Sequence, residues 1–133
     1  MTTLLERITN DLEIIQGSLF SIRWLVMVLT DPTQPLSAQN PRIPLDLSTY
    51  TAEMQVRAGI NSSAATLSFT TSDKLSVSSA GYVTLTLDGS ETANVPFTNQ
   101  WFVGVYDLRI TDQSGATTCI SEGQFLIDRA VTR

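Results

Sequence analysis

The stretch that decides the fold is "TAEMQVRAG" at residues 51–59, in which apolar and polar side chains alternate. Ala52, Met54 and Val56 fall on one side of an extended chain, because successive side chains of a β-strand point to opposite faces. The polar side chains fall on the other side: Glu53, Gln55 and Arg57. This period of two predicts a half-buried strand with one face in a core and one polar face.

The same alternation recurs along the chain, with turn residues such as the Ser-Gly of "QSGA" between the segments. The segments that read as strands are 12–16, 18–30, 65–70, 81–88, 101–112 and 117–128. Strands at this spacing, with no helical period of useful length, predict an all-β fold. We expect an antiparallel immunoglobulin-like β-sandwich of about seven to eight strands. The term refers to architecture, because the cysteine pair of antibody domains is absent.

A chain of 133 residues predicts a single domain, here 11–133, preceded by an N-terminal arm at 1–10. Leu4, Leu5 and Ile8 have helical spacing, which suits one short turn. The arm is either a frayed terminus or a segment that docks on a neighbouring subunit. "DPTQPLSAQNPRIP" at 31–44 holds four of the five prolines and predicts an insertion loop that is flexible or binds a partner.

The strand at 18–30 becomes apolar on both faces towards its end. Trp24 falls on one face, while Leu25 and Met27 fall on the other. Such a strand is either central in a sandwich or half covered by a partner. Leu25 and Met27 are therefore candidate interface residues.

Composition excludes several function classes. The net charge of −5 comes from scattered residues and leaves no basic patch for nucleic acid. The absence of histidine lowers the expectation of metalloenzyme or hydrolase chemistry. The N-terminus lacks the features of a secretory signal and the longest apolar run is too short to cross a bilayer, so we expect a cytosolic product without membrane insertion. Cys119, the single cysteine, reads as a small buried hydrophobe.

Carboxylates gather near the last predicted hairpin: Asp107, Asp112, Glu122 and Asp128. A paired-carboxylate site is conceivable there, but Arg109 and Arg129 share these strands, and outward charges on an edge hairpin usually solubilise it. "DQSG" at 112–115 is a weak calcium signal with a single carboxylate. The glycines are isolated and form no phosphate-binding loop, so no cofactor is expected and the chain is predicted not to be an enzyme.

The aromatic residues each allow more than one role. Tyr106 predicts either a tyrosine corner or a core ring whose hydroxyl reaches the rim. Trp24 and Trp101 suit a core anchor as well as an interface anchor. A carbohydrate-binding module would need an exposed platform of rings, drawn from Trp24, Tyr50, Tyr82 and Trp101. The polar face of Glu53, Gln55 and Arg57 is either solvated or a contact for another protein subunit.

Two stretches carry a family resemblance: "IPLDLSTYTAEMQVR" at 43–57, and "GYVTLTLD" with "VGVYDLRITDQSGATTCISEGQFLIDRAVTR" within 81–133. They resemble small β-sandwich proteins encoded among the structural genes of tailed bacteriophages and prophages. The matching positions are Asp46, Leu47, Tyr50, Ala52, Arg57, Gly81, Tyr106, Asp107, Leu108, Glu122, Gly123, Phe125, Val131, Thr132 and Arg133. The match covers over half of the chain in the same order, although its motifs describe a fold more than a function.

The resemblance implies a virion component that is assembled in the host cytoplasm in several symmetric copies. Its implied role is an adaptor in the tail or baseplate, which binds neighbouring virion proteins and connects or anchors tail fibres. A capsid decoration or neck protein is the alternative within the virion, and a carbohydrate-binding module is the alternative outside it. The Pro-rich insertion at 31–44 and the long apolar strand at 18–30 depart from the family pattern.

Overall fold

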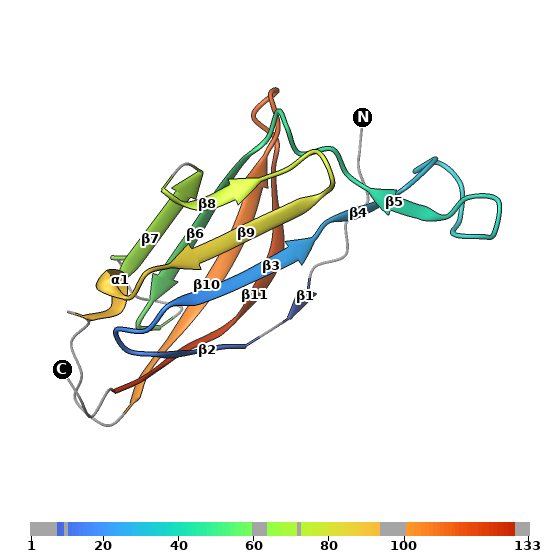
Figure 1. The fold of residues 1–133 in the computed structure, drawn as a ribbon. Helices are drawn as coiled ribbons and strands as arrows, with labels where there is room; N and C mark the ends of the chain where they lie inside the picture. The colour runs from blue at the N-terminus through green and yellow to red at the C-terminus, as the bar shows by residue number, and fades with distance from the viewer. Residues whose placement is uncertain (1–7, 10, 60–63, 72, 94–100, 130–133) are drawn as a thin grey trace.

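The computed structural model describes residues 8–9, 11–59, 64–71, 73–93 and 101–129. It forms two packed β layers with one short helix, as Figure 1 shows. The predicted all-β, immunoglobulin-like fold class is confirmed.

The larger layer contains the strand predicted from 51–59. Its strands are β1 (Ile8–Thr9), β2 (Leu12–Ile15), β6 (Thr51–Arg57), β7 (Leu67–Thr71), β10 (Trp101–Thr111) and β11 (Thr117–Asp128). β7, β6, β10 and β11 pair in that order, all antiparallel, and β1 and β2 then pair with β11 in parallel. The β10–β11 hairpin therefore has neighbours on both sides, and its prediction as an edge hairpin is wrong.

The smaller layer consists of three antiparallel strands. They are β8 (Lys74–Val77), β9 (Tyr82–Leu87) and β3 (Phe20–Leu25), with β9 in the middle. The chain reaches this layer from β7 at Lys74, which has a left-handed φ of 76°. Two parallel residue pairs between β7 and β8 bridge the layers at this corner. The left-handed residue turns the chain without a glycine or asparagine, which are the usual sequence signals for such a conformation.

This order of strands is the immunoglobulin order. β3, β9 and β8 occupy the places of strands B, E and D, whereas β6, β10 and β11 occupy those of C, F and G. β7 adds the strand that extends the C, F and G layer in variable-type domains. Hydrophobic packing takes the place of the B–F disulfide, because the chain has a single cysteine.

Alternate side chains of both layers fill one core. On β6 Ala52, Met54 and Val56 are 3% exposed or less, as the alternation predicts. Trp24 of β3 is 4% exposed and is a core anchor rather than an interface anchor. The largest fully buried side chains are Leu12, Ile14, Leu47, Met54, Val56, Leu75, Leu85, Leu87, Leu108, Ile110, Phe125 and Ile127.

The strand predicted over 18–30 is broken in two at Val26. β3 ends at Leu25 and forms the edge of the smaller layer, so it is not a central strand. β4 (Met27–Leu29) pairs instead with β5 (Arg42–Pro44) in a separate two-stranded sheet. This hairpin extends away from the sandwich in Figure 1. The predicted loop at 31–44 thus ends in a strand.

Two shorter elements complete the described chain. Ile8–Thr9 pairs in parallel with Ser121 and Glu122 of β11, so this part of the predicted N-terminal arm is an ordered strand and not a helical turn. The remainder of the predicted arm, including Leu4 and Leu5, lies outside the described residues. The helix α1 (Ser90–Ala93) occupies the connection that follows β9. None of the helical structure in the described chain has the length and apolar character that crossing a membrane requires.

Candidate interaction surfaces

The outer face of the larger layer holds the predicted polar residues of β6. Glu53 is exposed, and Gln55 and Arg57 are half-buried. Arg57 Nη2 donates to Gln55 Oε1 at 2.7 Å, so these two side chains bind each other along the strand. Glu53 lies opposite Arg109 of β10, a pairing of opposite charges that favours this register. The predicted polar face therefore exists, and two of its three side chains bind each other.

Asp107 and Glu122 face each other across the β10–β11 hairpin on the same outer surface. Arg109 binds Asp107 closely, because its Nε and Nη2 lie 2.8 and 2.7 Å from Asp107 Oδ2. Both contacts go to the same carboxylate oxygen, so Asp107 is engaged by a side chain of its own strand. The carboxylates are thus brought together, but with an arginine already bound to one of them.

Tyr106, Gly123 and Ser121 form a buried unit on the inner side of the same hairpin. Tyr106 lies opposite Gly123 and is 3% exposed. Its hydroxyl is 2.9 Å from Ser121 Oγ, and its ring meets Phe125 edge to face at 6.4 Å. The ring therefore contacts Ser121 and Phe125, the two residues that flank Gly123 on the same face of β11. Tyr106 is a core ring whose hydroxyl is bonded inside the core and does not reach the rim.

The polar environment of this core is arranged around β11. Burial raises the pKa of Tyr106, against the opposing effect of its hydrogen bond to Ser121. Cys119 lies two residues before Ser121 on β11 and is half-buried. Its Sγ lies 3.5 Å from the Ser121 carbonyl oxygen. Both groups are satisfied by the hairpin itself, which favours a structural role for each.

The β4–β5 hairpin, residues 27–44 and called the prong below, is built around Asn40. Asn40 is only 7% exposed, although the loop that contains it is predominantly exposed. Its Oδ1 accepts from the Asp31 N–H at 2.7 Å, and its Nδ2 donates to the carbonyls of Asp31, Gln34 and Pro35 within 2.9–3.1 Å. Prolines lack a backbone N–H, and the Asn40 amide supplies hydrogen-bond donors to the loop in their place. The insertion is an organised element.

The prong exposes two large apolar side chains on a surface that otherwise consists mostly of uncharged polar residues and prolines. Leu36 is 52% exposed at its tip and Ile43 is 43% exposed on β5. Asp31 and Arg42 are its charged residues, so the net charge of the prong is zero in a chain of net charge −5. The predicted interface residues Leu25 and Met27 lie at the end of β3 and the start of β4, where the prong leaves the sandwich. Leu25 is 39% exposed and Met27 is half-buried.

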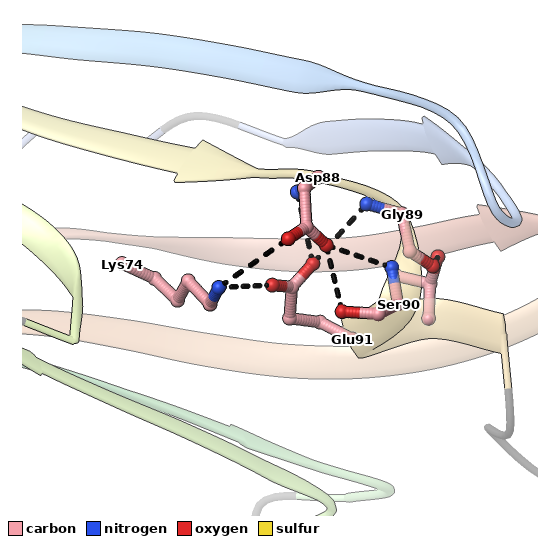
Figure 2. Close-up of polar contacts among 6 residues, drawn as sticks. Lys74, Asp88, Gly89, Ser90 and Glu91 are labelled. Atoms are coloured by element: carbon pink, nitrogen blue, oxygen red, sulfur yellow. Dashed lines mark hydrogen bonds and ion pairs between the residues drawn. The ribbon is translucent and has the colours of Figure 1, made fainter.

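Figure 2 shows a charged cluster of Lys74, Asp88 and Glu91 beside α1, at the end of the sandwich opposite the prong. Lys74 Nζ lies 2.8 Å from Glu91 Oε2 and 3.7 Å from Asp88 Oδ2. Glu91 Oε1 accepts from the backbone N–H groups of Asp88 and Gly89 at 3.0 and 3.2 Å. Asp88 Oδ1 accepts from the Ser90 N–H and hydroxyl at 2.9 and 2.7 Å. These contacts tie β8 to α1 and to the turn that precedes it.

The protonation of the cluster follows from these contacts. The hydrogen bonds from Ser90, with the charge of Lys74 adding to them, lower the pKa of Asp88 to about 2. The hydrogen bond to Glu91 raises the pKa of Lys74. Lys74 and Asp88 therefore both stay charged across the physiological range of pH.

Four aspartates share a turn motif that the sequence predictions missed. In each the carboxylate accepts from the N–H two residues later at 2.9–3.0 Å, as in an Asx turn: Asp31–Thr33, Asp46–Ser48, Asp88–Ser90 and Asp112–Ser114. The signal is Asp-x-Ser/Thr, which occurs at all four places. The pKa of all four carboxyl groups is lowered. The largest cause is the side-chain hydrogen bond of the Ser or Thr for Asp31, Asp88 and Asp112, and the Ser48 N–H for Asp46.

The motif also explains the weak calcium signal at 112–115. Asp112 Oδ1 accepts from the N–H groups of Ser114 and Ala116 and from the Ser114 hydroxyl. The carboxylate thus organises its own turn. Among the described residues no group of three or more histidine, cysteine, aspartate or glutamate side chains is placed to hold a metal ion.

The aromatic rings do not provide a sugar-binding platform in the described part of the chain. Trp24 is buried, and Tyr50 is half-buried against the core. The Tyr82 ring is half-buried and lies 4.1 Å beneath the Arg23 guanidinium carbon. Sugar stacking needs an open ring face. The side chain of Trp101 lies outside the described residues.

Comparison with known proteins leaves the family open. No protein-family model matches the chain, and no curated protein matches it. A solved structure of murine CRIg is similar with a TM-score of 0.34 and 10% sequence identity, over 97% of this chain and 97% of that one. A likeness at this TM-score carries no argument, and the fold rests on the strand order described above.

Proposed function

We propose that this protein is a non-enzymatic structural component of a bacteriophage virion. In this role it is an adaptor in the tail or baseplate that binds neighbouring virion proteins and connects or anchors tail fibres. The sequence resemblance is the starting point of the proposal. Three of the matching residues, Tyr106, Gly123 and Phe125, lie together in the β10–β11 hairpin and support a shared fold. Surface features are needed to support a role in assembly.

The observation that carries the proposal is the prong. A two-stranded hairpin is marginally stable alone, and this one extends from the sandwich with Leu36 and Ile43 exposed. Four hydrogen bonds to the Asn40 side chain hold its loop in one conformation. A preorganised projection with exposed apolar side chains loses little conformational freedom when a partner covers it. That property suits a protein whose work is to join others.

The carboxylates support a role without catalysis. Asp107 is bound by Arg109, and the carboxylates of Asp88 and Glu91 are engaged with Lys74 and backbone N–H groups. Each of these groups is used to hold strands or turns together. The polar outer face of β6 and β10 offers a second contact surface, whose paired charges suit the rim of an interface.

The test is photo-cross-linking within purified particles of the phage that encodes the chain. Lys74 is the single lysine and is ion-paired, so lysine chemistry would not report on the prong. A photo-reactive amino acid at Leu36 would report on it directly, and the same residue at the exposed Gln113 of the β10–β11 turn is the control for general proximity. We expect Leu36 to form specific links to tail, baseplate or fibre subunits.

The other outcomes separate the alternatives. Links to the major capsid protein would replace the adaptor role by a decoration or neck role. Absence of the chain from the particles would overturn both virion roles, and a glycan array would then test the carbohydrate-binding alternative.

A further inference from the structure

The edge of β3 is unpaired, and it continues into β4. β3 ends the strand order of its layer, with β9 on one side and no described strand on the other. At Val26 the N–H donates to the Gly81 carbonyl at 2.7 Å and the carbonyl accepts from Leu45 N–H at 2.9 Å. The N–H and C=O of one extended residue point to the same side. β9 and β5 therefore flank the same side of β3 and β4, and no described strand pairs with the opposite side of either.

The alternation of backbone groups identifies what this open side presents. Val26 and Thr30 bond towards β9 and β5, since the Thr30 N–H donates to the Pro41 carbonyl at 3.0 Å. Even-numbered residues thus use their backbone groups on the paired side. The odd-numbered residues direct an N–H and a C=O to the open side: Ser21, Arg23, Leu25, Met27 and Leu29.

The usual protections of a sheet edge are missing here. Natural edges carry prolines, bulges or charges that block pairing with another chain. Residues 19–29 contain no proline, and the pairing of residues 20–25 with β9 has no irregularity. Arg23 is the one charge in the segment, and its guanidinium lies over the Tyr82 ring of β9, on the side away from the open edge. Leu19 and Leu25 are 76% and 39% exposed beside it.

We propose that a second copy of this chain pairs antiparallel with this edge, with Leu25 opposite Leu25. This register uses all five open positions, because it pairs Ser21 with Leu29 and Arg23 with Met27. It also keeps the two arginines apart along the strands. Two copies of an acidic chain repel over most of their surface, whereas this segment carries a single positive charge and allows close approach. The contact is isologous and closes, so it removes the exposed edge from both copies.

The inference stands on strand geometry and not on the phage resemblance. The test is sedimentation equilibrium of the full chain over a concentration series, with Leu25→Lys as the variant. Leu25→Lys places two like charges directly opposite each other and should weaken the dimer by roughly tenfold or more. Leu19→Lys is the matched control, because it adds the same charge at a more exposed residue that lies beyond the ladder. It should leave the dimer unchanged.

Residue-resolved amide exchange of the unmodified protein provides a second readout that does not depend on a variant. Protection of the Arg23, Leu25 and Met27 amides should rise with protein concentration, while those of Ile22 and Trp24 stay protected throughout. A monomer at all concentrations, or a dimer that Leu25→Lys does not weaken, would overturn the proposal. A Leu25 amide that is protected at every concentration would overturn it too, because the edge would then be covered by the chain itself.

Discussion

Tyr106 and Ser121 form a buried pair of hydroxyls whose contribution can be measured directly. Ser121 is fully buried and its Oγ lies 2.9 Å from the Tyr106 hydroxyl. Tyr106→Phe should lower the free energy of unfolding by about 1–2 kcal/mol, because it leaves a buried polar group with one partner fewer. Urea denaturation checks this value. In the Tyr106→Phe, Ser121→Ala double variant the second change should add little, and additive losses would argue against coupling of the pair.

Gly89 is a residue whose conformation and surroundings both require glycine. It has a φ of 105°, and a Cβ added there would collide with the backbone carbonyl of Gly17. Gly89→Ala should therefore destabilise the protein by about 1–3 kcal/mol or more, measured as a lower thermal midpoint at constant pH. Gly115→Ala is the matched control, because Gly115 has a φ of 90° but open space around it. Equal losses at both positions would show that the collision with Gly17 has no effect.

Single residues also show where sequence reasoning succeeds. Met54 and Val56 were predicted to be buried, because a period of two in a strand determines the face of every residue. Lys74 was not recognised as the corner between the layers, because a left-handed lysine gives no signal in the sequence. The pairing of Arg109 with Asp107 was not predicted either, although both were expected to point outward.

At the scale of elements, the prong depends on one side chain. Asn40→Ala removes four hydrogen bonds from the loop, and we expect faster amide exchange within 31–40 by about tenfold or more. Amides of β9 and β10 should keep their protection, because the prong is a separate sheet. The exposed neighbour Gln39→Ala is the control. Unchanged exchange in the Asn40 variant would mean that its hydrogen bonds do not organise the loop.

The Asx turns predict how stability depends on acid. Their carboxyl groups have a pKa below the ordinary 3.8 in the folded chain, and that of Asp88 is about 2. A lowered folded-state pKa means that the unfolded chain binds protons first as the pH falls. The stabilisation is therefore complete above about pH 4 and is lost between that pH and about 2. Urea midpoints measured across this window should fall, and Asp88→Asn should reduce the slope. An unchanged slope would contradict the assignment of the acid dependence to Asp88.

Some strands were predicted correctly from the sequence, whereas the break between β3 and β4 was not. The segments around β9, β10 and β11 were found because their apolar residues alternate and turn residues separate them. The break at Val26 was missed, because residues 24–29 are apolar without interruption and read as one strand. Whether such a run stays in the sheet depends on a distant partner, here Gly81 and Leu45, which a local pattern does not reveal.

At the scale of the whole molecule, the fold class followed from strand spacing, but the surface that distinguishes this chain did not. A proline-rich insertion predicted a loop, and only the hydrogen bonds of Asn40 show that it is an organised projection. The open β3–β4 edge likewise depends on the strand order of both layers. The two features lie next to each other, because β4 belongs to both. In the proposed adaptor one of them would join copies of the chain and the other would reach a different virion protein.

The most direct measurement of the central claim is quantitative mass spectrometry of purified phage particles, with tail and capsid fractions separated. The account predicts that the chain is present in the tail fraction at a low copy number that matches the symmetry of the tail. A chain that is absent from the particles, or that occurs in the capsid fraction at a copy number near that of the major capsid protein, would contradict it.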